Sequence, residues 1–383
     1  MDSLPYNAWL AGPLPEGVEA AIARICRTQG VAHVAVMPDV HLATEFCVGT
    51  AVASEECLFP GAVGGDIGCG MLALQFDADA AVLEDPQKAA RLLGFLETMC
   101  PSRRHHRKLA PEWPGELRDA VPSHEQLRKD LHSSEALLQL GTLGAGNHFL
   151  EFQREQASGS LWLMIHTGSR GFGQRVYHHH LARARRADSG IMAIQSDTVE
   201  GGAYLADVRV GRAYARWNRR LLAIAAARAA ELVLHASPNM ETLVDCDHNH
   251  VQWESHAVGL TEPRGFFVHR KGATAAAEGQ PGLIPGSMAT HSFHTTGLGC
   301  ARALCSSSHG AGREMSRTQA RNGISRSAFR RQLQHVFYDA RLEGKLLEEA
   351  PAAYKDIHAV MRAQGELTRI VRRLAPVLIY KGI

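Results

Sequence analysis

The sequence predicts an α+β fold, because its strand-like runs are short and do not alternate regularly with helices. Hydrophobic residues make up 45% of the 383 residues and charged residues 21%, which is typical of a globular chain and excludes wholesale disorder. No internal repeat or clear linker interrupts the chain. We therefore expect a single domain over residues 1–383, in which mixed or antiparallel sheets surround a central cleft.

Short apolar runs predict the strands of the first half. Residues 31–37 are expected to form a buried strand that stops at Pro38, and residues 48–53 form the next one. Five glycines then fall between residues 61 and 70, where the backbone is free to turn tightly and to approach a ligand. Residues 101–124 are rich in Pro, Arg and His and are expected to form an excursion on the surface.

A long helix is the main element predicted for the second half. Tyr214, Trp217, Leu221 and Ile224 recur at spacings of three and four within a helix expected from about residue 203 to 235, and this stripe should face the core. A Gly/Ser-rich tract follows, and a helical C-terminal part is expected from about residue 325. The remaining strands are expected at 161–165, 243–244 and 265–268, and the Gly/Ser-rich tract at 282–312.

Charge and cysteine usage exclude several classes of protein. The chain has 41 Lys and Arg against 39 Asp and Glu, so its formal net charge of +2 excludes a histone-like or polybasic protein. The first twelve residues lack a basic region and a long apolar run, so no secretory signal is expected. No apolar run approaches the roughly 18 residues of a membrane span. Eight dispersed cysteines fit a reduced cytosol, so we expect a cytoplasmic protein.

Five short segments place a metal-ligating residue type among small residues. One such histidine is more often structural, but five segments in one chain favour metal ligation, because Asp, Cys and His are themselves ligands. Ligand softness alone favours zinc, with a thiolate able to bridge two ions. The segments are 66–70, 146–151, 164–171, 247–250 and 306–313, and the ligands that they offer for one or two divalent ions are Asp66, Cys69, His148, His166 and His248.

His309 differs from the other histidines in its surroundings. Gly310 and Gly312 follow it and expose the backbone, and Arg313 and Arg317 lie nearby in the sequence to hold anions. Histidine is able to act as a covalent nucleophile. This setting predicts chemistry on phosphoryl groups.

Longer motifs occur in a fixed order from about residue 31 to the C-terminus. They are Met37-Pro-Asp39-Val-His41, Gly64-Gly-Asp66-Ile-Gly-Cys69-Gly-Met71, Gly141 to Glu151, His166 to Gly171, Pro285 to Met288, Ser308 to Arg317, Ala353 to Asp356 and Lys381-Gly382. Taken together, these motifs resemble the RtcB family of RNA-splicing ligases over nearly the whole chain.

The resemblance implies a GTP- and Mn²⁺-dependent RNA ligase with a central metal and nucleotide cleft. Such an enzyme joins a 2′,3′-cyclic phosphate or 3′-phosphate RNA end to a 5′-hydroxyl end, in RNA repair or tRNA splicing. Two Mn²⁺ ions replace the zinc expectation, because a hard carboxylate and nucleotide phosphates favour manganese. The implied ligand sets are Asp66, Cys69 and His148 for one ion, and Cys69, His166 and His248 for the other.

The same resemblance implies roles for further residues. His309 would attack the α-phosphate of GTP and become guanylylated, and Asp39 would orient it. Arg170, Arg313 and Arg317 resemble RNA phosphate contacts. The implied guanine-nucleotide contacts are Asn147, Phe149, Glu151, Asn249, Pro285, Gly286, Ser287, Met288, Ser292, Gly310, Ala311, Gly312, Tyr354 and Lys381.

One segment departs from the family pattern. After His41 the family usually has Leu or Gln followed by Gly-x-Gly, whereas this chain has Leu42 and then Ala43-Thr44-Glu45-Phe46. Two glycines are lost, so the local backbone and the approach of RNA are expected to differ. This version resembles a branch often encoded beside a peptide-release-factor homologue, which implies repair of cleaved ribosomal RNA rather than joining of tRNA halves. Archease or that homologue are the protein partners that the resemblance implies, and no membrane is expected.

Two other functions stay open from the sequence. A metal-dependent RNA phosphoesterase or cyclic phosphodiesterase would use the metals without nucleotidyl transfer, but it needs no guanine pocket. A non-catalytic RNA-binding relative would not need the intact ligand set.

Three histidine- or arginine-rich segments also have simple interpretations. We expect residues 178–180 to be an exposed helix face. The segment from Arg313 to Arg331 has six Arg and one Glu, with Arg313, Arg317 and Arg321 on one face if it is helical, and it predicts a local anion surface. Residues 103–108 are expected to form either a solvated basic loop or an RNA contact.

Overall fold

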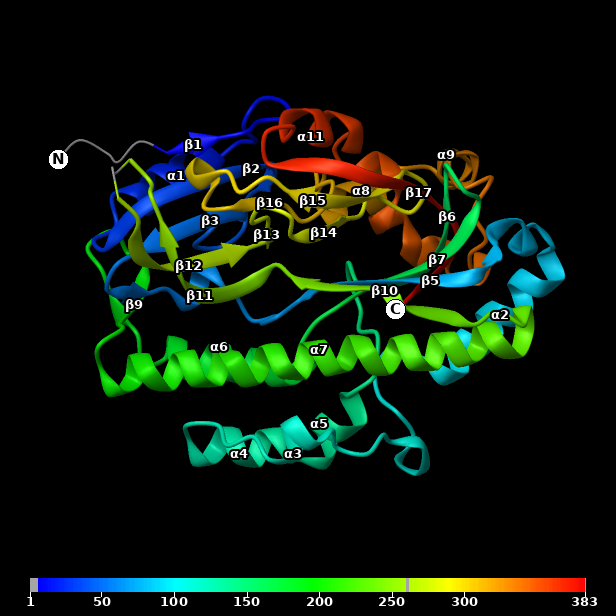
Figure 1. Cartoon of the computed structure of the whole chain (residues 1–383), viewed down its shortest axis with the longest axis horizontal. Helices are drawn as coiled ribbons and strands as arrows, with labels where there is room; N and C mark the ends of the chain where they lie inside the picture. Colours follow the sequence, from blue (N-terminus) through cyan, green and yellow to red (C-terminus); the bar gives the residue numbers. More distant parts are fainter. Residues whose placement is uncertain (1–5, 260–261, 383) are drawn as a thin grey trace.

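The structure of the chain, a computed structural model, describes residues 6–259 and 262–382 (Figure 1). Its strands are β1 (Asn7–Ala8), β2 (Val31–His41), β3 (Val48–Ser54), β4 (Cys57–Leu58), β5 (Gly70–Asp79), β6 (Phe149–Glu155), β7 (Ser160–Thr167), β8 (Arg185–Arg186), β9 (Met192–Gln195), β10 (Pro238–Asp247), β11 (Asn249–His256), β12 (Arg264–Lys271), β13 (Ala273–Ala275), β14 (Pro281–Ile284), β15 (Ser292–Gly297), β16 (Ser306–Ser308) and β17 (Thr368–Lys381).

The helices are mostly short, with one exception of 36 residues. They are α1 (Val18–Cys26), α2 (Pro86–Met99), α3 (Gly115–Arg118), α4 (Glu125–Leu131), α5 (Ser134–Gln139), α6 (Arg170–Leu181), α7 (Val199–Leu234), α8 (Arg317–Gly323), α9 (Arg326–Gln332), α10 (Glu343–Leu346) and α11 (Ile357–Ala363). No helix in the described part of the chain has the length and apolar character needed to cross a bilayer.

Two larger sheets carry the fold. One has five strands in the order β1-β2-β3-β12-β11 and the other seven in the order β10-β5-β7-β6-β17-β15-β14. Smaller sheets pair β13 with β16 and β4 with β9 and β8. Sequence-distant strands lie side by side in both larger sheets, and antiparallel pairing predominates. The prediction of an α+β fold with mixed or antiparallel sheets is confirmed, and the single-domain boundary stays a prediction.

Alternation along the seven-stranded sheet separates the core from the face that carries the site. On β7, Leu161, Leu163 and Ile165 join the largest apolar cluster, which also includes residues of α2 and α7. His166 has the opposite orientation, because successive side chains of a strand point to opposite faces. The same alternation places Glu151 of β6 away from this core. Helices α2 and α7 therefore pack on one face of the sheet, while the other face carries the polar residues of the site beside a smaller apolar cluster that includes Met71 and Met164.

The long helix was predicted in nearly the right place, and three of the four stripe residues, Tyr214, Trp217 and Leu221, lie in or against an apolar core cluster. The helix begins at Val199, where the Thr198 hydroxyl caps the Gly201 amide, rather than near residue 203. Ile224 of the predicted stripe is 64% exposed. The inner face also includes the buried polar residues Asn218 and Arg219, which interrupt the apolar pattern.

Two further predictions are also wrong, one for the end of a strand and one for the C-terminal part. β2 does not stop at Pro38 but continues to His41, because its pairing with β3 is irregular between Val36 and His41 and needs no ladder hydrogen bond from the proline. The helical C-terminal part ends at Ala363, and β17 then lies centrally between β6 and β15. The Gly/Ser-rich tract at 282–312 likewise contributes β15 and β16.

Residues 178–180 are only partly an exposed helix face. His178 is exposed, but His180 is fully buried and contacts Glu200 Oε1 at 2.6 Å and Asp207 Oδ2 at 2.7 Å. Asp207 also accepts hydrogen bonds from the amide and hydroxyl of Ser123. This cluster joins α6, α7 and the end of the 101–124 excursion.

Asp207→Ala should lower the free energy of unfolding by about 3–5 kcal/mol, because it leaves His180 and Ser123 without their buried partner. Urea denaturation followed by circular dichroism measures this loss. Glu231→Ala is the control: it removes an exposed ion pair with Arg228 on the same helix and should cost less than about 0.5 kcal/mol. Equal losses in the two variants would contradict the role given to Asp207.

Candidate metal and nucleotide site

A cleft of about 970 Å³ brings together most of the residues that the sequence predicted. His309 and the ligands Cys69, His166 and His248 line it. Asp39, His148, Arg170 and Ser292 are not among the lining residues and lie behind or beside them. The predicted residues that line the cleft are Asp66, Cys69, Asn147, Phe149, Glu151, His166, His248, Asn249, Pro285, Gly286, Ser287, Met288, His309, Gly310, Ala311, Gly312, Arg313, Arg317, Tyr354 and Lys381.

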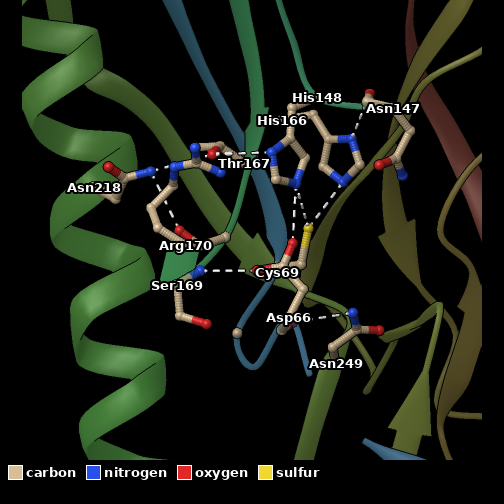
Figure 2. A network of polar contacts seen from close by, with 12 residues as sticks. Asp66, Cys69, Asn147, His148, His166, Thr167, Ser169, Arg170, Asn218 and Asn249 are labelled. Atoms are coloured by element: carbon tan, nitrogen blue, oxygen red, sulfur yellow. Dashed lines mark hydrogen bonds and ion pairs between the residues drawn. The ribbon is translucent and has the colours of Figure 1, made fainter. Parts of the chain in front are cut away.

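Cys69 is the centre of the metal-ligating residues. Its Sγ lies 3.5 Å from His148 Nε2 and 3.2 Å from His166 Nε2 (Figure 2). His166 Nε2 in turn lies 3.4 Å from His248 Nε2, and Asp66 Oδ2 lies 2.9 Å from His148 Nε2. These donors form two groups that share the thiol: Cys69, His166 and His248, and Asp66, Cys69 and His148.

Backbone carbonyls orient two of the imidazoles. His148 Nδ1 donates to Leu143 O at 3.0 Å, and His166 Nδ1 donates to Asn147 O at 3.2 Å. A ring nitrogen that donates to a carbonyl leaves the other nitrogen with a free lone pair, so both residues present Nε2 to Cys69.

The glycines beside Cys69 allow the backbone to pack closely. Gly68 has φ of 69°, and a Cβ there would lie 2.8 Å from Arg212 Cα of α7. A Cβ on Gly70 would lie 2.2 Å from Cys246 O of β10. Only glycine fits these positions, so here the glycines allow close packing of the chain against α7 and β10, and the expected approach to a ligand stays a prediction.

The burial of these donors suits them to a divalent cation. Burial lowers the pKa of His166 and of His248 well below the ordinary value, so both rings are neutral ligands. Burial, with the Asp66 charge, raises the pKa of the Cys69 thiol well above its usual range. A bound cation offsets that penalty and favours the thiolate. The donor types and their 2.9–3.5 Å spacing therefore fit metal ligation.

Two residues of α7 that the sequence analysis missed fasten the ligand loops. Asn218 Oδ1 accepts from the amides of Gly141 and Thr142, and its Nδ2 donates to Gly168 O at 3.2 Å. Arg219 donates through Nη1 to Gly68 O at 2.7 Å and to Thr167 O at 3.1 Å. No signal in the sequence singled them out, because α7 carries other charged residues such as Arg212, Arg216 and Arg220. Figure 2 shows Asn218 reaching from α7 toward Thr167.

His309 is held by a buried carboxylate. Its Nδ1 donates to Asp39 Oδ2 at 2.6 Å, and its backbone amide donates to the same oxygen at 3.1 Å. Asp39 is fully buried, and Gly312, with φ of 74°, packs against its backbone. Nε2 is thereby left with the free lone pair. The His309 ring lies 4.7 Å from the His248 ring, centroid to centroid, so the histidine is next to the metal-ligating groups.

The other end of the cleft contains two buried carboxylates. Glu151 accepts hydrogen bonds from Gln153 and Ser292, and burial raises its pKa to about 7 against their effect and that of Lys381. Glu349, which the sequence analysis missed, accepts from Lys381 Nζ at 2.8 Å and from the Tyr354 hydroxyl at 2.6 Å. Glu349 thus positions two of the predicted nucleotide contacts.

The predicted arginine surface from Arg313 to Arg331 is partly compensated by glutamates, and a positive excess remains. Three glutamates pair with five of its six arginines. Arg313 also precedes α8, which begins at Arg317, so the expected common helix face is wrong for Arg313. Glutamates later in the chain therefore reduce the charge of a run that has only one acidic residue in the sequence. The pairs are Arg313 and Arg317 with Glu349, Arg321 with Glu348, and Arg326 and Arg330 with Glu343.

The segment that departs from the family pattern lies at the cleft. Leu42, Ala43 and Thr44 line it, whereas Phe46 is fully buried and packs against Phe59 at 5.7 Å between ring centroids. The chain therefore uses one of these positions for core packing. A changed approach of RNA at this edge stays a prediction.

The fold and site define a protein with a carboxylate-oriented histidine next to donor atoms for two cations. Comparison with known sequences then identifies the family. The family described as tRNA-splicing ligase RtcB matches residues 21–121 and 114–382. The chain belongs to the RtcB family.

Individual relatives agree with this assignment along most of their length. RNA-splicing ligase RtcB1 of Escherichia coli strain ATCC 25922 is 36% identical over 377 residues, which cover 91% of this chain and 90% of the relative. RNA-splicing ligase RtcB of E. coli K12 is 35% identical, with the same coverage. The tRNA-splicing ligase RtcB of Nanoarchaeum equitans is 30% identical over 92% of this chain and 88% of its own.

Cys69→Ala should remove both bound cations, because the two ligand groups share this thiol. We expect about two Mn²⁺ per chain in the wild type after dialysis against the metal, and less than about half an ion per chain in the variant, measured by plasma mass spectrometry. Cys100→Ala, which alters a buried cysteine of the apolar core, should keep the wild-type stoichiometry. Retention of a full ion in Cys69→Ala would contradict a shared thiolate.

Proposed function

We propose that this chain is a GTP- and Mn²⁺-dependent RNA ligase that joins 2′,3′-cyclic phosphate or 3′-phosphate ends to 5′-hydroxyl ends through a guanylylated histidine. The observation that carries the proposal is the hydrogen bond from His309 Nδ1 to Asp39, next to two groups of metal donors in one cleft. Relatives named RNA-splicing ligases support the reaction class. A phosphoesterase would need neither His309 nor the buried Glu151.

His309 acts as the nucleophile of the first step. Its Nε2 lone pair attacks the α-phosphorus of GTP, a P–N bond forms, and the bond to the departing pyrophosphate breaks. Asp39 keeps the proton on Nδ1 and stabilises the positive charge that develops on the ring, as a carboxylate does for other catalytic histidines. GMP then passes from His309 to the RNA 3′-phosphate, after water has opened any cyclic phosphate. The RNA 5′-hydroxyl finally attacks the activated phosphorus and expels GMP.

Two Mn²⁺ ions would be held by the groups that share Cys69, and they would supply neutralisation of charge on phosphoryl oxygens. Arg170, beside the cleft, adds a cation for that charge. Arg170 has no carboxylate partner among the described residues, and its guanidinium donates to Thr142 Oγ1 and Ser102 O. It is therefore available to an RNA phosphate near Asp66.

The guanine base would lie at the end of the cleft where Glu151, Phe149 and Lys381 meet. An ionised Glu151 offers two acceptor oxygens to the N1 and N2 donors of guanine, which an adenine lacks. Phe149 supplies an aromatic ring beside this position. The selectivity for GTP over ATP follows from this carboxylate.

We assign the physiological role to RNA repair, with cleaved ribosomal RNA favoured over tRNA halves by the Ala43 to Phe46 segment. Archease or a peptide-release-factor homologue would be the protein partner, in the cytoplasm. Matched cleaved ribosomal and transfer RNA substrates distinguish the two roles by their relative kcat/KM.

Incubation of the protein with Mn²⁺ and α-labelled GTP should produce an acid-labile label, and His309→Ala should reduce it to background. Asp39→Asn should keep the fold but slow labelling by about 10²–10⁴-fold, because the amide no longer holds Nδ1–H in place. Quenched samples separated by gel electrophoresis give the rate. A folded, metal-loaded wild type that takes up no label would refute the ligase proposal.

Glu151→Gln should separate nucleotide binding from stability. The pKa of Glu151 in the folded chain is about 7, above the ordinary value of 4.5, so folding favours the protonated form and wild-type stability falls as pH rises through this window. The variant lacks this titration, so its Tm relative to wild type should rise between pH 5 and pH 8. Its affinity for GMP at pH 8 should fall by roughly tenfold or more, because one acceptor oxygen becomes a donor.

Scanning calorimetry and equilibrium dialysis with GMP measure the two effects. Glu155→Gln on the same strand is the control, since Glu155 lies outside the cleft. Unchanged GMP affinity in Glu151→Gln would contradict the assigned guanine contact.

A further inference from the structure

Exposed positive charge without a counter-ion lies in a segment that the proposed reaction does not yet use. Residues 103–108, here called the basic loop, carry Arg103, Arg104, Arg107 and Lys108, and all four side chains belong to exposed residues. Within the described ranges, none of the four forms an ion pair with a carboxylate. The arginines from Arg313 to Arg330, in contrast, are paired with glutamates. An exposed cation without a counter-ion is the better site for a phosphate.

The basic loop is fastened to the loop that positions a metal ligand. Gly144 N donates to Ser102 O at 2.7 Å, and Leu143 N donates to Pro101 O at 3.0 Å. Leu143 O in turn accepts from Nδ1 of His148. Leu143 therefore links Pro101, which precedes the basic loop, to the imidazole of His148 through two hydrogen bonds.

A second set of contacts fixes the loop itself. His105 N donates to Leu138 O at 2.8 Å, and its Nε2 lies 3.2 Å from Gly141 O. His105 is half-buried, whereas its neighbours on both sides are exposed. The contacts of His105 thus fix the backbone of the basic loop, and the flanking cations project from it. Less conformational entropy is then lost when a ligand binds.

Arg170 connects the loop to the reacting centre. Its Nη2 donates to Ser102 O at 3.4 Å, directly before Arg103, and it lies beside Asp66 and the ligand loops (Figure 2). A series of cationic side chains without carboxylate partners therefore begins beside the metal donors and ends at the surface. It consists of Arg170, Arg103, Arg104, Arg107 and Lys108.

We propose that the basic loop binds the sugar-phosphate backbone of the RNA strand whose end reacts in the cleft. This inference rests on the proposed function and names where that substrate is held. Guanidinium groups pair with phosphates without reading bases, and the loop has no Phe, Tyr or Trp on which a base would stack. Recognition here is consequently independent of sequence. Continuity with Arg170 and the metal donors favours RNA over an acidic protein partner.

The test compares two triple variants with the same change of charge. R103Q/R104Q/R107Q neutralises the basic loop. R183Q/R185Q/R186Q neutralises three exposed arginines beyond the far end of α6, which is 12 residues long and so places them about 18 Å or more from Arg170. The ligand is a fluorescent single-stranded RNA that ends in a 3′-phosphate, and anisotropy gives Kd over a range of salt concentrations.

We expect the loop variant to bind this RNA more weakly and to lower the slope of log K against log salt by about 2, which is the release expected for three phosphate contacts to a single strand. The control variant should change that slope by less than about 0.5. An unchanged slope in the loop variant, or equal changes in both variants, would overturn the inference, the second outcome showing an effect of bulk charge alone. A Tm within about 2 °C of wild type verifies the fold.

A crosslinking measurement on the wild-type protein tests the inference even if the loop variant misfolds. RNA that carries 4-thiouridine near its 3′-phosphate should crosslink to the peptide that contains residues 101–109, and crosslinks confined to other peptides would refute the proposal. His309 labelling by GTP needs no RNA, so it tests the proposed function separately. A protein that labels but fails both RNA measurements would lose this inference and keep the ligase proposal.

Discussion

The crowding of one buried thiol, three buried imidazoles and one half-buried carboxylate within 3.5 Å of their neighbours is the constraint on which the rest of the molecule depends. Buried polar groups cost several kcal/mol each unless they are bonded or coordinate a cation. The chain meets this cost in two ways. Backbone carbonyls take the Nδ1 protons of His148 and His166, and the remaining lone pairs converge where a divalent cation is the natural partner. The folded backbone therefore prepares the ligands for the metal.

The two faces of the seven-stranded sheet have different roles, one in core packing and the other in carrying the site. Leucines and isoleucines of β5, β6 and β7 pack against α2 and α7, while the alternate residues carry the site. Helix α7 contributes to both, because its inner face continues from Leu222 to Asn218 and Arg219, which hold the loops before His148 and after His166. Rigidity at the ligands thus comes from a helix that supplies none of them. Glu349 has the same function at the end of the cleft where we propose that the nucleotide binds, because it fixes Lys381 and Tyr354.

The sequence predicted most of the residues that the structure brings together in the cleft, and it missed the residues that support them. Residues that bear ligands carried short motifs with glycine, so Cys69, His166 and His309 were identified before any contact was known. β17 was missed because its 14 residues mix Arg with apolar residues and resemble a helix end. The pairing of Glu349 with Arg313 joins residues 36 apart, and no local pattern reports such a contact. The sequence therefore did not allow us to predict which distant residues pair with buried polar groups.

The central claim is that His309, held at Nδ1 by Asp39, reacts through Nε2. The most direct measurement is nitrogen-15 NMR of histidine-labelled protein, quenched after reaction with Mn²⁺ and GTP, combined with peptide mass spectrometry. The account predicts a single GMP adduct on His309, with phosphorus bonded to Nε2 and the proton on Nδ1. An adduct on Nδ1 or on a lysine, or no adduct in metal-loaded folded protein, would contradict it.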